Sequence, residues 1–461
     1  MTILKKLLSL TKSFDRFVVI ILLVIFALII SLILMGDRVG VQAEVFYPEP
    51  GTATSVHSRI SIRFDEPMAT ASVESHFSIT PNTDGEFIWE DAQTLWFMPS
   101  EPLDPTTDYE VALKPGAQAE SGREIVRQQT WTIAVRQPDI LFLVLDDFGG
   151  DLWRYETETG LTFQVTNTGG FVTDFAIDAT GEWISYAQVN PQGGSDLWTV
   201  NRMGTEPSMI ADCDRDYCTQ PAWSPDGEWI AYSREEFSQE DALLEPARIW
   251  TLYTPTTETN RLYENPDVFG HSPSFSPDGK HLATYNTNQN AIRILNLDTG
   301  EESVIPSVLL GVGDWSPDGS KMMYTDLVPS VLEPNVAVYI ADFTTQQVDH
   351  AFGEFIPDTD FSPPRWSPDG DWVAFGARPI GGGINKAIWI INLDGSAPVQ
   401  VTDDPTATFT NYRWDPWGEQ LVFQRFPTSG PNLQASIWIW DHTTQETRLL
   451  IEHGARPEWL P

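Results

Sequence analysis

A short phrase that returns along the chain constrains its fold more than any other feature. The phrase is an aromatic residue followed by Ser-Pro-Asp-Gly and then by a β-rich run. Its copies, four intact and two altered, begin at Trp223, Phe275, Trp315, Trp366, Phe175 and Trp414. The glycines that close them, from Gly181 to Gly418, recur roughly every 40 to 50 residues, which is room for one four-stranded propeller blade per copy.

The phrase has the chemistry of a hairpin turn. Proline presets φ at the first corner, aspartate bonds its own backbone, and glycine accepts the positive φ that closes the hairpin. The aromatic residue ends one strand, and a run such as Trp229 to Tyr232 begins the next. A third strand, as in Arg248 to Trp250, and a fourth, as in Val399 to Thr402, complete the repeat. The sequence therefore predicts four strands per blade.

The two ends of the repeat array complement each other. Residues 140–166 read as strands two to four of a blade that lacks its first strand. The segment Pro457 to Pro461 matches Pro221 to Pro225, which ends the first strand of another repeat. A first strand from the C-terminal side would complete this blade and remove an open sheet edge. Six complete blades and this composite one predict a seven-bladed β-propeller over residues 139–461.

The repeat resembles that of the extracytoplasmic β-propellers of the TolB type, which carry the same Trp-Ser-Pro-Asp-Gly turn. The resemblance covers residues 139–461 and rests on the four intact copies. It implies a propeller that serves as a docking platform, as a regulatory cap of a serine peptidase or, occasionally, as a catalytic support. TolB-like propellers usually have six blades, so the seven predicted here depart from that pattern.

A second β-rich module precedes the propeller. Residues 44–136 alternate turns with short β runs at Ile60 to Phe64, Phe77 to Ile79, Thr94 to Phe97, Tyr109 to Leu113 and Gln129 to Ile133. This pattern fits a small antiparallel sandwich. Tyr47-Pro48, Phe64 to Met68 and Pro105 to Tyr109 resemble bacterial Ig-like domains of the SbsA type. Such domains act mainly as spacers or adhesive modules, so the expected fold class is all-β with one N-terminal helix.

The N-terminus predicts a transmembrane helix. Residues 17–35 carry no charge, and as a helix they would span roughly 28 Å, close to the hydrocarbon thickness of a bilayer. Lysines and an arginine precede this run, so the positive-inside rule places residues 1–16 in the cytoplasm. Residues 36–43 would form a linker, with the bulk of the chain extracytoplasmic. The alternative is a signal peptide cleaved after Val41-Gln42-Ala43.

Charge and cysteine content fit that compartment. A net charge of −38 and a pI near 4.3 would repel nucleic acid, so no nucleic-acid partner is expected. The acidity is interpreted as a solvated surface, with a cation-binding surface as the alternative. Cys213 and Cys218 are the two cysteines and share one predicted loop. A local disulfide is expected in an oxidising compartment, and a metal pair is the alternative.

No motif predicts catalysis, a cofactor or a metal. Asp212, Asp214 and Asp216 imitate the start of a calcium loop, but Tyr217 stands where an EF-hand needs glycine. The seven histidines lack metal-ligand spacing, and no Gly-x-Ser-x-Gly elbow occurs. The aspartates of the repeat are interpreted as turn residues and its tryptophans as packing between blades. The chain is therefore predicted not to be an enzyme.

The sequence best fits a membrane-anchored extracytoplasmic binding or scaffolding protein. The predicted partners are the membrane, through the N-terminal helix, and an unidentified protein or cell-envelope polymer, through the loops of the propeller. The longest such loops are Glu235 to Arg248, Asp326 to Asn335, Arg378 to Lys386 and Pro427 to Ala435. Within the third of these, the candidate interaction residues are Arg378, Ile384, Asn385 and Lys386. The alternatives are an extracellular hydrolase or lyase with a carboxylate site at the propeller mouth, and a structural component of the cell envelope.

Overall fold

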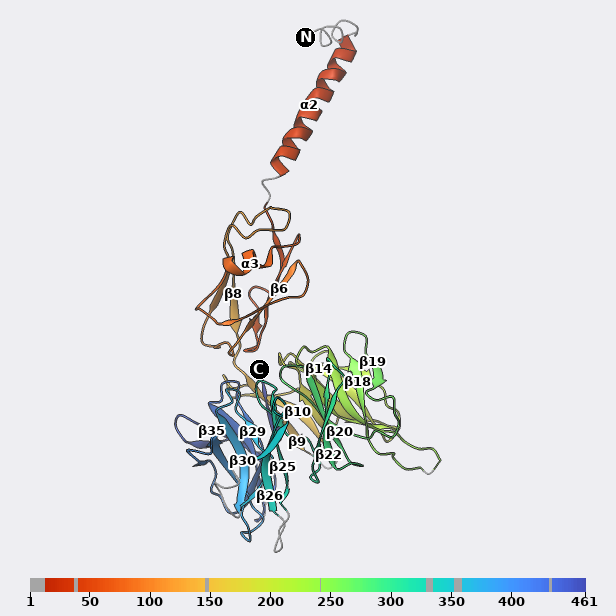
Figure 1. Ribbon diagram of the computed structural model, residues 1–461, viewed down its shortest axis with the longest axis vertical. Helices are drawn as coiled ribbons and strands as arrows, with labels where there is room; N and C mark the ends of the chain where they lie inside the picture. Colours follow the sequence, from red (N-terminus) through yellow and green to blue (C-terminus); the bar gives the residue numbers. More distant parts are fainter. Residues whose placement is uncertain are drawn as a thin grey trace. The chain divides into compact units, whose positions relative to one another are not determined.

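The computed structural model describes residues 13–36, 40–145, 149–240, 242–328, 335–351, 359–430 and 433–461, without the side chains of residues 13–16, 32–36 and 45. The predicted cytoplasmic segment, residues 1–16, lies largely outside this set. The chain forms two compact units. The first consists of Met1–Thr54 and Ser58–Val135, and the second consists of Ser55–His57 and Arg136–Pro461. Both units are built mostly of β-strands (Figure 1).

The N-terminal apolar run forms a helix, α2 (Ser13–Gly36). Large apolar side chains between Phe17 and Ile30 are exposed along it. Within the described part of the chain, no helix is both long enough and apolar enough to cross a membrane.

The first unit contains a sandwich of two four-stranded sheets and one short helix, α3 (Thr70–His76). One sheet has the order β1 (Ala43–Tyr47), β3 (Ile60–Phe64), β6 (Thr94–Pro99) and β5 (Gly85–Trp89). The other has the order β2 (Ala53–Thr54), β8 (Gln129–Val135), β7 (Tyr109–Leu113) and β4 (Phe77–Thr80). The alternation of buried and exposed residues along β8 is what a strand with one covered face requires.

Aromatic side chains join the two sheets of the sandwich. Phe46 of β1 lies 4.4 Å from Trp131 of β8, measured between ring centroids, and Phe77 of β4 lies 5.2 Å from Phe97 of β6. Within the predicted linker, residues 36–43, Val41 is buried and its N–H donates to the Glu124 oxygen at 3.1 Å, so this residue packs with the sandwich.

The second unit consists of propeller-like sheets. Its described strands fall into seven consecutive sets, which we call the composite blade and the second to seventh blades. The composite blade pairs β37 (Ala455–Leu460), β9 (Asp139–Leu145), β10 (Gly150–Tyr155) and β11 (Thr162–Gln164). The second has β12 (Val172–Ile177), β13 (Trp183–Val189), β14 (Ser195–Asn201) and β15 (Ser208–Ala211). The third has β16 (Tyr217–Trp223), β17 (Trp229–Glu235), β18 (Arg248–Tyr253) and β19 (Glu258–Arg261).

The remaining blades repeat this pattern. The fourth has β20 (His271–Phe275), β21 (His281–Asn286), β22 (Ala291–Asn296) and β23 (Glu302–Pro306). The fifth has β24 (Asp314–Trp315), β25 (Lys321–Val328), β26 (Asn335–Asp342) and β27 (Gln347–Ala351). The sixth has β28 (Thr359–Phe361), β29 (Arg365–Trp366), β30 (Trp372–Pro379), β31 (Ala387–Asn392) and β32 (Val399–Gln400). The seventh has β33 (Ala407–Trp414), β34 (Gln420–Pro427), β35 (Ser436–Asp441) and β36 (Thr447–Ile451).

The composite blade joins the two ends of the second unit. Strand β37 pairs antiparallel with β9, with Trp459 opposite Ile140 and Leu460 opposite Asp139, and the C-terminus lies beside these strands in Figure 1. On the other side, Ile140 and Phe142 pack against Val422 and Ile437 of the seventh blade. The first and last blades of the array are therefore in direct contact.

A buried charge cluster holds the end of β37. Arg136 donates from Nε and Nη2 to the main-chain oxygen of Pro461, at 3.1 and 3.0 Å, and Arg202 donates to it from Nη1 at 2.6 Å. Arg202 also pairs through Nη2 with Asp139 at 3.0 Å, and Arg154 pairs with the same carboxylate oxygen at 2.5 Å. Asp139, Arg154 and Arg202 are only 4 to 6% exposed, and burial lowers the pKa of Arg202 to about 10.

The aromatic residue of the repeated phrase connects each blade to the one before it. Trp315 packs with Ile292 and Ile294 of the fourth blade, and its indole N–H donates to Ser274 Oγ at 3.2 Å. Trp414 donates in the same way to the Arg365 oxygen at 3.3 Å. The prediction that these tryptophans pack between blades is confirmed.

The Ser-Pro-Asp-Gly turn is held by its own side chains. In the third blade, Ser224 Oγ accepts from the Trp229 N–H at 2.9 Å, and the Asp226 carboxylate accepts from the Glu228 N–H at 3.0 Å. Gly227 has a φ of 76°, a conformation that a residue with a Cβ adopts at a cost. In the altered copy of the seventh blade, Asp415 replaces the serine, and its carboxylate accepts from the Gln420 N–H at 2.8 Å. Burial raises the pKa of Asp415 to about 6.

Replacement of Asp415 by serine is expected to stabilise the propeller at neutral pH. The raised pKa means that folding disfavours the ionised carboxylate, so this group costs no stability below its usual pKa and costs progressively more as the pH rises towards about 6. The full effect is on the order of 2 to 3 kcal/mol. Urea denaturation of Asp415→Ser and the wild type at pH 4 and pH 8 measures it. A difference in midpoint that does not grow between the two pH values would contradict this assignment.

Candidate functional site

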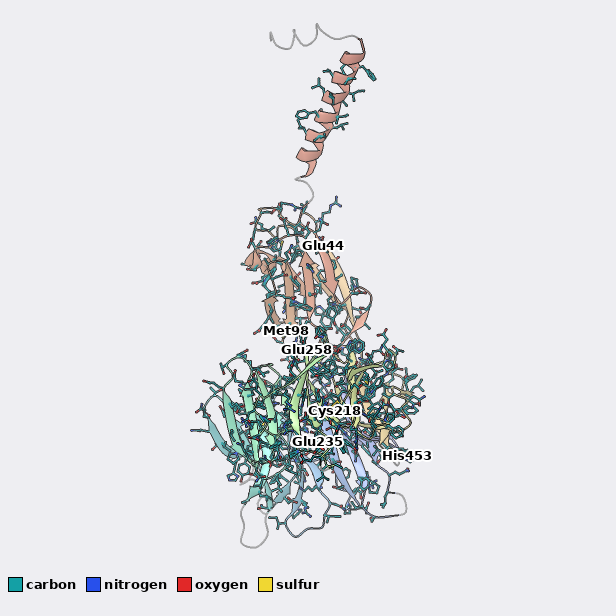
Figure 2. All side chains as sticks on the ribbon, turned by 90° about the vertical axis from the view of Figure 1, so that its right-hand side faces the viewer. Glu44, Met98, Cys218, Glu235, Glu258 and His453 are labelled. Atoms are coloured by element: carbon teal, nitrogen blue, oxygen red, sulfur yellow. A yellow bond between two sulfur atoms is a disulfide. The ribbon has the colours of Figure 1, made fainter. Side chains whose placement is uncertain are left out.

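One end of the propeller carries the elaborated loops, and we call it the loop face. It consists of the hairpin loops between the second and third strands of the blades and of the connections between blades. All four loops that the sequence singled out join a second strand to a third strand. Glu235, which is labelled in Figure 2, lies at the end of β17. The loop after it is described except for residue 241. Residues 329–334 and 431–432 of the second and fourth loops lie outside the described residues.

Large apolar side chains are exposed around the loop face. They come from the composite, third, fifth, sixth and seventh blades and from two connections between blades. The set is Leu145, Phe171, Leu243, Leu244, Val308, Leu310, Leu327, Ile384, Phe426 and Leu433. Ile384 and Leu310, at 76 and 74% exposure, are the most exposed of the large apolar side chains described in this unit. Apolar groups on this scale commonly mark a surface that another molecule covers.

The four predicted interaction residues of the sixth blade have different surroundings. Arg378 Nε pairs with Asp360 at 2.7 Å, and Lys386 Nζ lies 3.4 Å from the same carboxylate. Asn385 donates to the Pro405 oxygen at 2.6 Å and to Thr428 Oγ1 at 3.0 Å. Of the four, only Ile384 is exposed; Arg378, Asn385 and Lys386 are half-buried. The structure thus brings Arg378 and Lys386 together around Asp360, a residue that the sequence analysis did not single out.

An aspartate and an arginine recur together at the loop face of three blades. The pairs are Asp216 with Arg234, Asp360 with Arg378, and Asp404 with Arg425. In each, the aspartate lies at or just before the first strand of the blade and the arginine near the end of its second strand. The pairs therefore tie the entry of a blade to its longest hairpin.

In two of these pairs, the contacts lower the pKa of the aspartate and keep it ionised. Hydrogen bonds from Thr406 and then from Arg425 lower the pKa of Asp404 to about 2. Burial alone would raise the pKa of Asp360, but the hydrogen bond from Arg378 and the charge of Lys386 outweigh it and lower the pKa. A general acid needs a pKa near the working pH. Asp360 and Asp404 are therefore poor proton donors at neutral pH.

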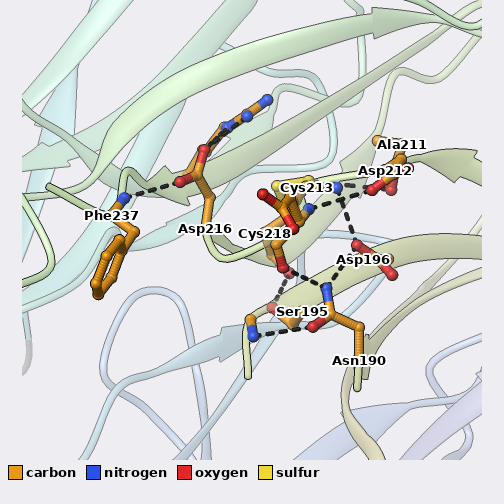
Figure 3. Close-up of a disulfide and its surroundings, with 12 residues drawn as sticks. Asn190, Ser195, Asp196, Ala211, Asp212, Cys213, Asp216, Cys218 and Phe237 are labelled. Atoms are coloured by element: carbon orange, nitrogen blue, oxygen red, sulfur yellow. Dashed lines mark hydrogen bonds and ion pairs between the residues drawn. A yellow bond between two sulfur atoms is a disulfide. The ribbon is translucent and has the colours of Figure 1, made fainter. Parts of the chain in front are cut away.

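Cys213 and Cys218 form a disulfide in the connection between the second and third blades (Figure 3). Both are buried, and Figure 3 shows Asp196 accepting from the Cys213 N–H, at 2.9 Å. The loop that the disulfide closes also contains Asp216, whose carboxylate accepts from the Phe237 N–H at 2.8 Å. The disulfide loop therefore contacts the start of the long hairpin after Glu235. The aspartates that imitate a calcium loop do not converge, because Asp216 is engaged by Arg234.

A histidine and a serine lie together in the fourth blade, but the architecture accounts for them. His271 Nδ1 is 2.8 Å from Ser272 Oγ, and Ser272 has a φ of 54°. The same left-handed conformation recurs in a bulge of the first strand at Gln220, Asn411 and Arg456. The Gln220 side chain accepts from the Ser272 N–H at 2.9 Å, so the bulge links neighbouring blades. Among the described residues, no group of three His, Cys, Asp or Glu side chains is placed to hold a metal ion.

A ring of residues on the first strands was missed by the sequence analysis. It consists of the residue just before the aromatic residue of each blade. These residues are Asp174, Ala222, Ser274, Asp314, Arg365, Arg413 and Glu458. First strands of neighbouring blades contact one another, as β16 does with β20 and β29 with β33, so we call this set the inner ring. The sequence did contain a signal for this ring. The residue before the aromatic residue of the phrase is acidic in some copies, basic in others and uncharged in the rest.

The comparisons with known proteins concern the two units separately. Residues 37–133 match a family model described as a bacterial Ig-like domain. This segment is a bacterial Ig-like domain. The part of the chain that follows is similar to solved TolB structures and to an uncharacterised bacterial protein. Both resemblances expected from the sequence are confirmed.

Three relatives of the propeller region illustrate the likeness. An uncharacterised protein of Agrobacterium fabrum is 23% identical over 254 residues, which is 52% of this chain and 81% of that protein. The crystal structure of TolB from Acinetobacter baumannii has a TM-score of 0.42 at 19% identity and covers 71% of this chain and 82% of that one. An oligogalacturonate lyase from Vibrio parahaemolyticus has a TM-score of 0.50 at 14% identity, with 69 and 87% coverage. At these identities the likeness concerns the fold alone.

Proposed function

We propose that this protein is a membrane-anchored extracytoplasmic binding or scaffolding protein. Its seven-bladed propeller head docks a protein or a cell-envelope polymer at the loop face and does not turn that partner over. The observation that carries the proposal is the set of exposed apolar side chains around the loop face, led by Leu310 and Ile384. Exposed apolar patches on soluble domains commonly serve as interaction sites, and loops on a rigid scaffold commonly provide them.

The carboxylates of the loop face support binding over acid-base chemistry. A hydrolase or lyase would need at least one carboxyl group with a pKa suited to proton transfer. Asp404, with a pKa of about 2, and Asp360, with a lowered pKa, stay ionised and paired with arginine instead. Such pairs position loops and tune the charge of a contact surface.

Substitution of the two most exposed apolar residues should weaken partner capture strongly. The double variant Leu310→Asp with Ile384→Asp places charge at the two most exposed apolar positions of the loop face, and loss of two apolar contacts is expected to reduce capture by about tenfold or more. The melting temperature should stay unchanged, because both side chains are exposed. Crosslinking in intact cells, followed by mass spectrometry of the adducts, measures the capture.

Met203→Asp is the matched control. Met203 is 62% exposed but lies in the turn between β14 and β15, at the opposite end of the propeller. This variant should retain the adducts. If the double variant still forms the crosslinked adducts, or if Met203→Asp loses them equally, the loop face is not the docking surface.

We further propose that α2 anchors the chain in the membrane with residues 1–16 in the cytoplasm. The support is the uncharged run from Phe17 to Met35, the basic residues before it, and the exposed apolar side chains along the helix. Protease added to intact cells should then digest the chain from residue 44 onwards. Protection of the propeller until the cells are lysed would reverse this topology.

A further inference from the structure

We propose that the inner ring binds a carboxylate group between Arg365 and Arg413. This site is separate from the loop face, because the ring residues lie next to the Ser-Pro-Asp-Gly turns, at the other end of the first strands. The ligand class is an organic carboxylate, either a small free acid or a carboxylate carried on a polymer.

Five members of the inner ring are charged, in the order Asp314, Arg365, Arg413, Glu458 and Asp174. The two arginines are therefore neighbours, as are the carboxylates Glu458 and Asp174. Asp314 of the fifth blade pairs with Arg365 of the sixth at 3.2 Å. Arg413 of the seventh blade pairs with Glu458 of the composite blade at 2.7 Å. The junction between the sixth and seventh blades therefore sets Arg365 and Arg413 next to each other with no ring carboxylate between them.

Contacts between the first strands bring these two arginines into proximity. Strands β29 and β33 touch, and the indole N–H of Trp414, the residue after Arg413, donates to the main-chain oxygen of Arg365 at 3.3 Å. The charge of Arg413 contributes, after burial, to a lowered pKa of Arg365, which is the signature of two neighbouring cations. Asp314 and Glu458 offset part of this repulsion, and a bound anion would offset more of it.

The ring itself demonstrates that a carboxylate fits beside each guanidinium group. Asp314 and Glu458 occupy such places on the outer sides of the two arginines. The contacts described for Arg365 use only its Nη1, and those of Arg413 use Nε and Nη1. A guanidinium group has five N–H donors in a planar fork that matches a carboxylate, so donors remain for a further one.

Water and solutes reach these side chains. Asp314 and Arg365 are each 27% exposed at the side chain, Arg413 is 28% exposed and Glu458 is 31% exposed. The opposite part of the ring carries the short side chains Ala222 and Ser274. In a chain with a net charge of −38, this junction places two guanidinium groups on neighbouring first strands, and each of them already pairs with one ring carboxylate.

The test titrates the full-length chain in mild detergent at constant ionic strength. Acetate, followed by saturation-transfer NMR, represents the small free acid, and poly-L-glutamate, followed by calorimetry, represents the polymer. Binding of acetate assigns the small acid, whereas binding of poly-L-glutamate alone assigns the polymer. Absence of binding by either probe would overturn the proposal.

Variants of the ring locate the binding. Arg365→Gln and Arg413→Gln should each weaken the binding about tenfold or more, because each removes charge-assisted hydrogen bonds. Arg425→Gln, which breaks an arginine–aspartate pair at the loop face, is the matched control and should leave it unchanged. Equal binding by the wild type and both ring arginine variants would overturn the site.

Removal of an internal carboxylate gives a test that does not depend on losing an arginine. Asp314→Asn and Glu458→Gln should each strengthen the binding several-fold, because the freed guanidinium group then serves the added carboxylate alone. In the wild type, Asp314 Oδ2 accepts a hydrogen bond from the Trp366 N–H at 2.7 Å. The amide oxygen of Asp314→Asn can accept the same hydrogen bond. A purely structural role of the ring predicts no gain in either variant, and that result would also overturn the proposal. None of these outcomes depends on the partner of the loop face.

Discussion

Deletion of residues 456–461 is expected to destabilise the propeller far more than the length of the segment suggests. The deletion removes all of β37 except Ala455, so the edge of β9 at Ile140 and Leu141 loses its partner strand. Leu460, which is fully buried, leaves a cavity beside β9, and Arg202 loses the Pro461 oxygen at 2.6 Å. Loss of one buried leucine alone costs about 2 to 5 kcal/mol. The urea midpoint should therefore fall steeply, and aggregation through the open strand edge should rise.

A control for this deletion lies directly before β37. Substitution of the exposed residues Glu452 and His453 by serine changes the same connection without touching the strand, and it should leave the midpoint unchanged. Single variants Trp459→Ala and Leu460→Ala should fall between the control and the deletion. An unchanged midpoint for the deletion would show that β37 is dispensable and would contradict the composite blade.

Asp139→Asn is expected to be the most damaging single substitution that preserves side-chain shape. It leaves Arg154 and Arg202, which are 5 and 6% exposed, buried together without the carboxylate that both of them contact. Breaking a buried ion pair in this way costs about 3 to 5 kcal/mol. Because Arg202 also holds Pro461, the loss should spread to β37. Chemical denaturation of the variant measures the change in midpoint.

Asp404→Asn provides the contrast. Asp404 and Arg425 form a pair of similar geometry, at 2.5 Å, but their side chains are 34 and 23% exposed. Pairs open to solvent contribute little, so this variant should cost about 1 kcal/mol or less. If the two variants lower the midpoint equally, burial is not what makes the Asp139 cluster important.

The parts of the fold that could be predicted from sequence are those governed by local chemistry. The Ser-Pro-Asp-Gly turn predicts its own hydrogen bonds: Asp226 accepts from the Glu228 N–H two residues on, and Gly227 has the expected positive φ. Because each turn fixes two strand ends, the repeat spacing places most strands of the propeller. The exposed apolar residue Ile384 could likewise be found, since a long hairpin loop keeps its tip in solvent.

The parts that could not be predicted depend on contacts between strands of one blade or of different blades. Arg378 and Lys386 look like free cations in the sequence, but the first strand of their blade brings Asp360 to both of them. Arg365 and Asp314 are 51 residues apart, and Arg202 and Pro461 are 259 residues apart. Such pairs depend on the register between strands of different blades, which no turn motif encodes.

The composite blade has a consequence for biosynthesis. Arg136 and Pro461, which meet at the closure, are separated by 325 residues, so β9 is made long before β37 exists. At an elongation rate of about 5 to 20 residues per second, the edge of β9 stays without its partner for roughly 15 to 60 s. Secondary structure within a blade forms much faster than this. The time during which a nascent chain is open to domain swapping is therefore set by the ribosome, and slower translation of the last blades would lengthen it.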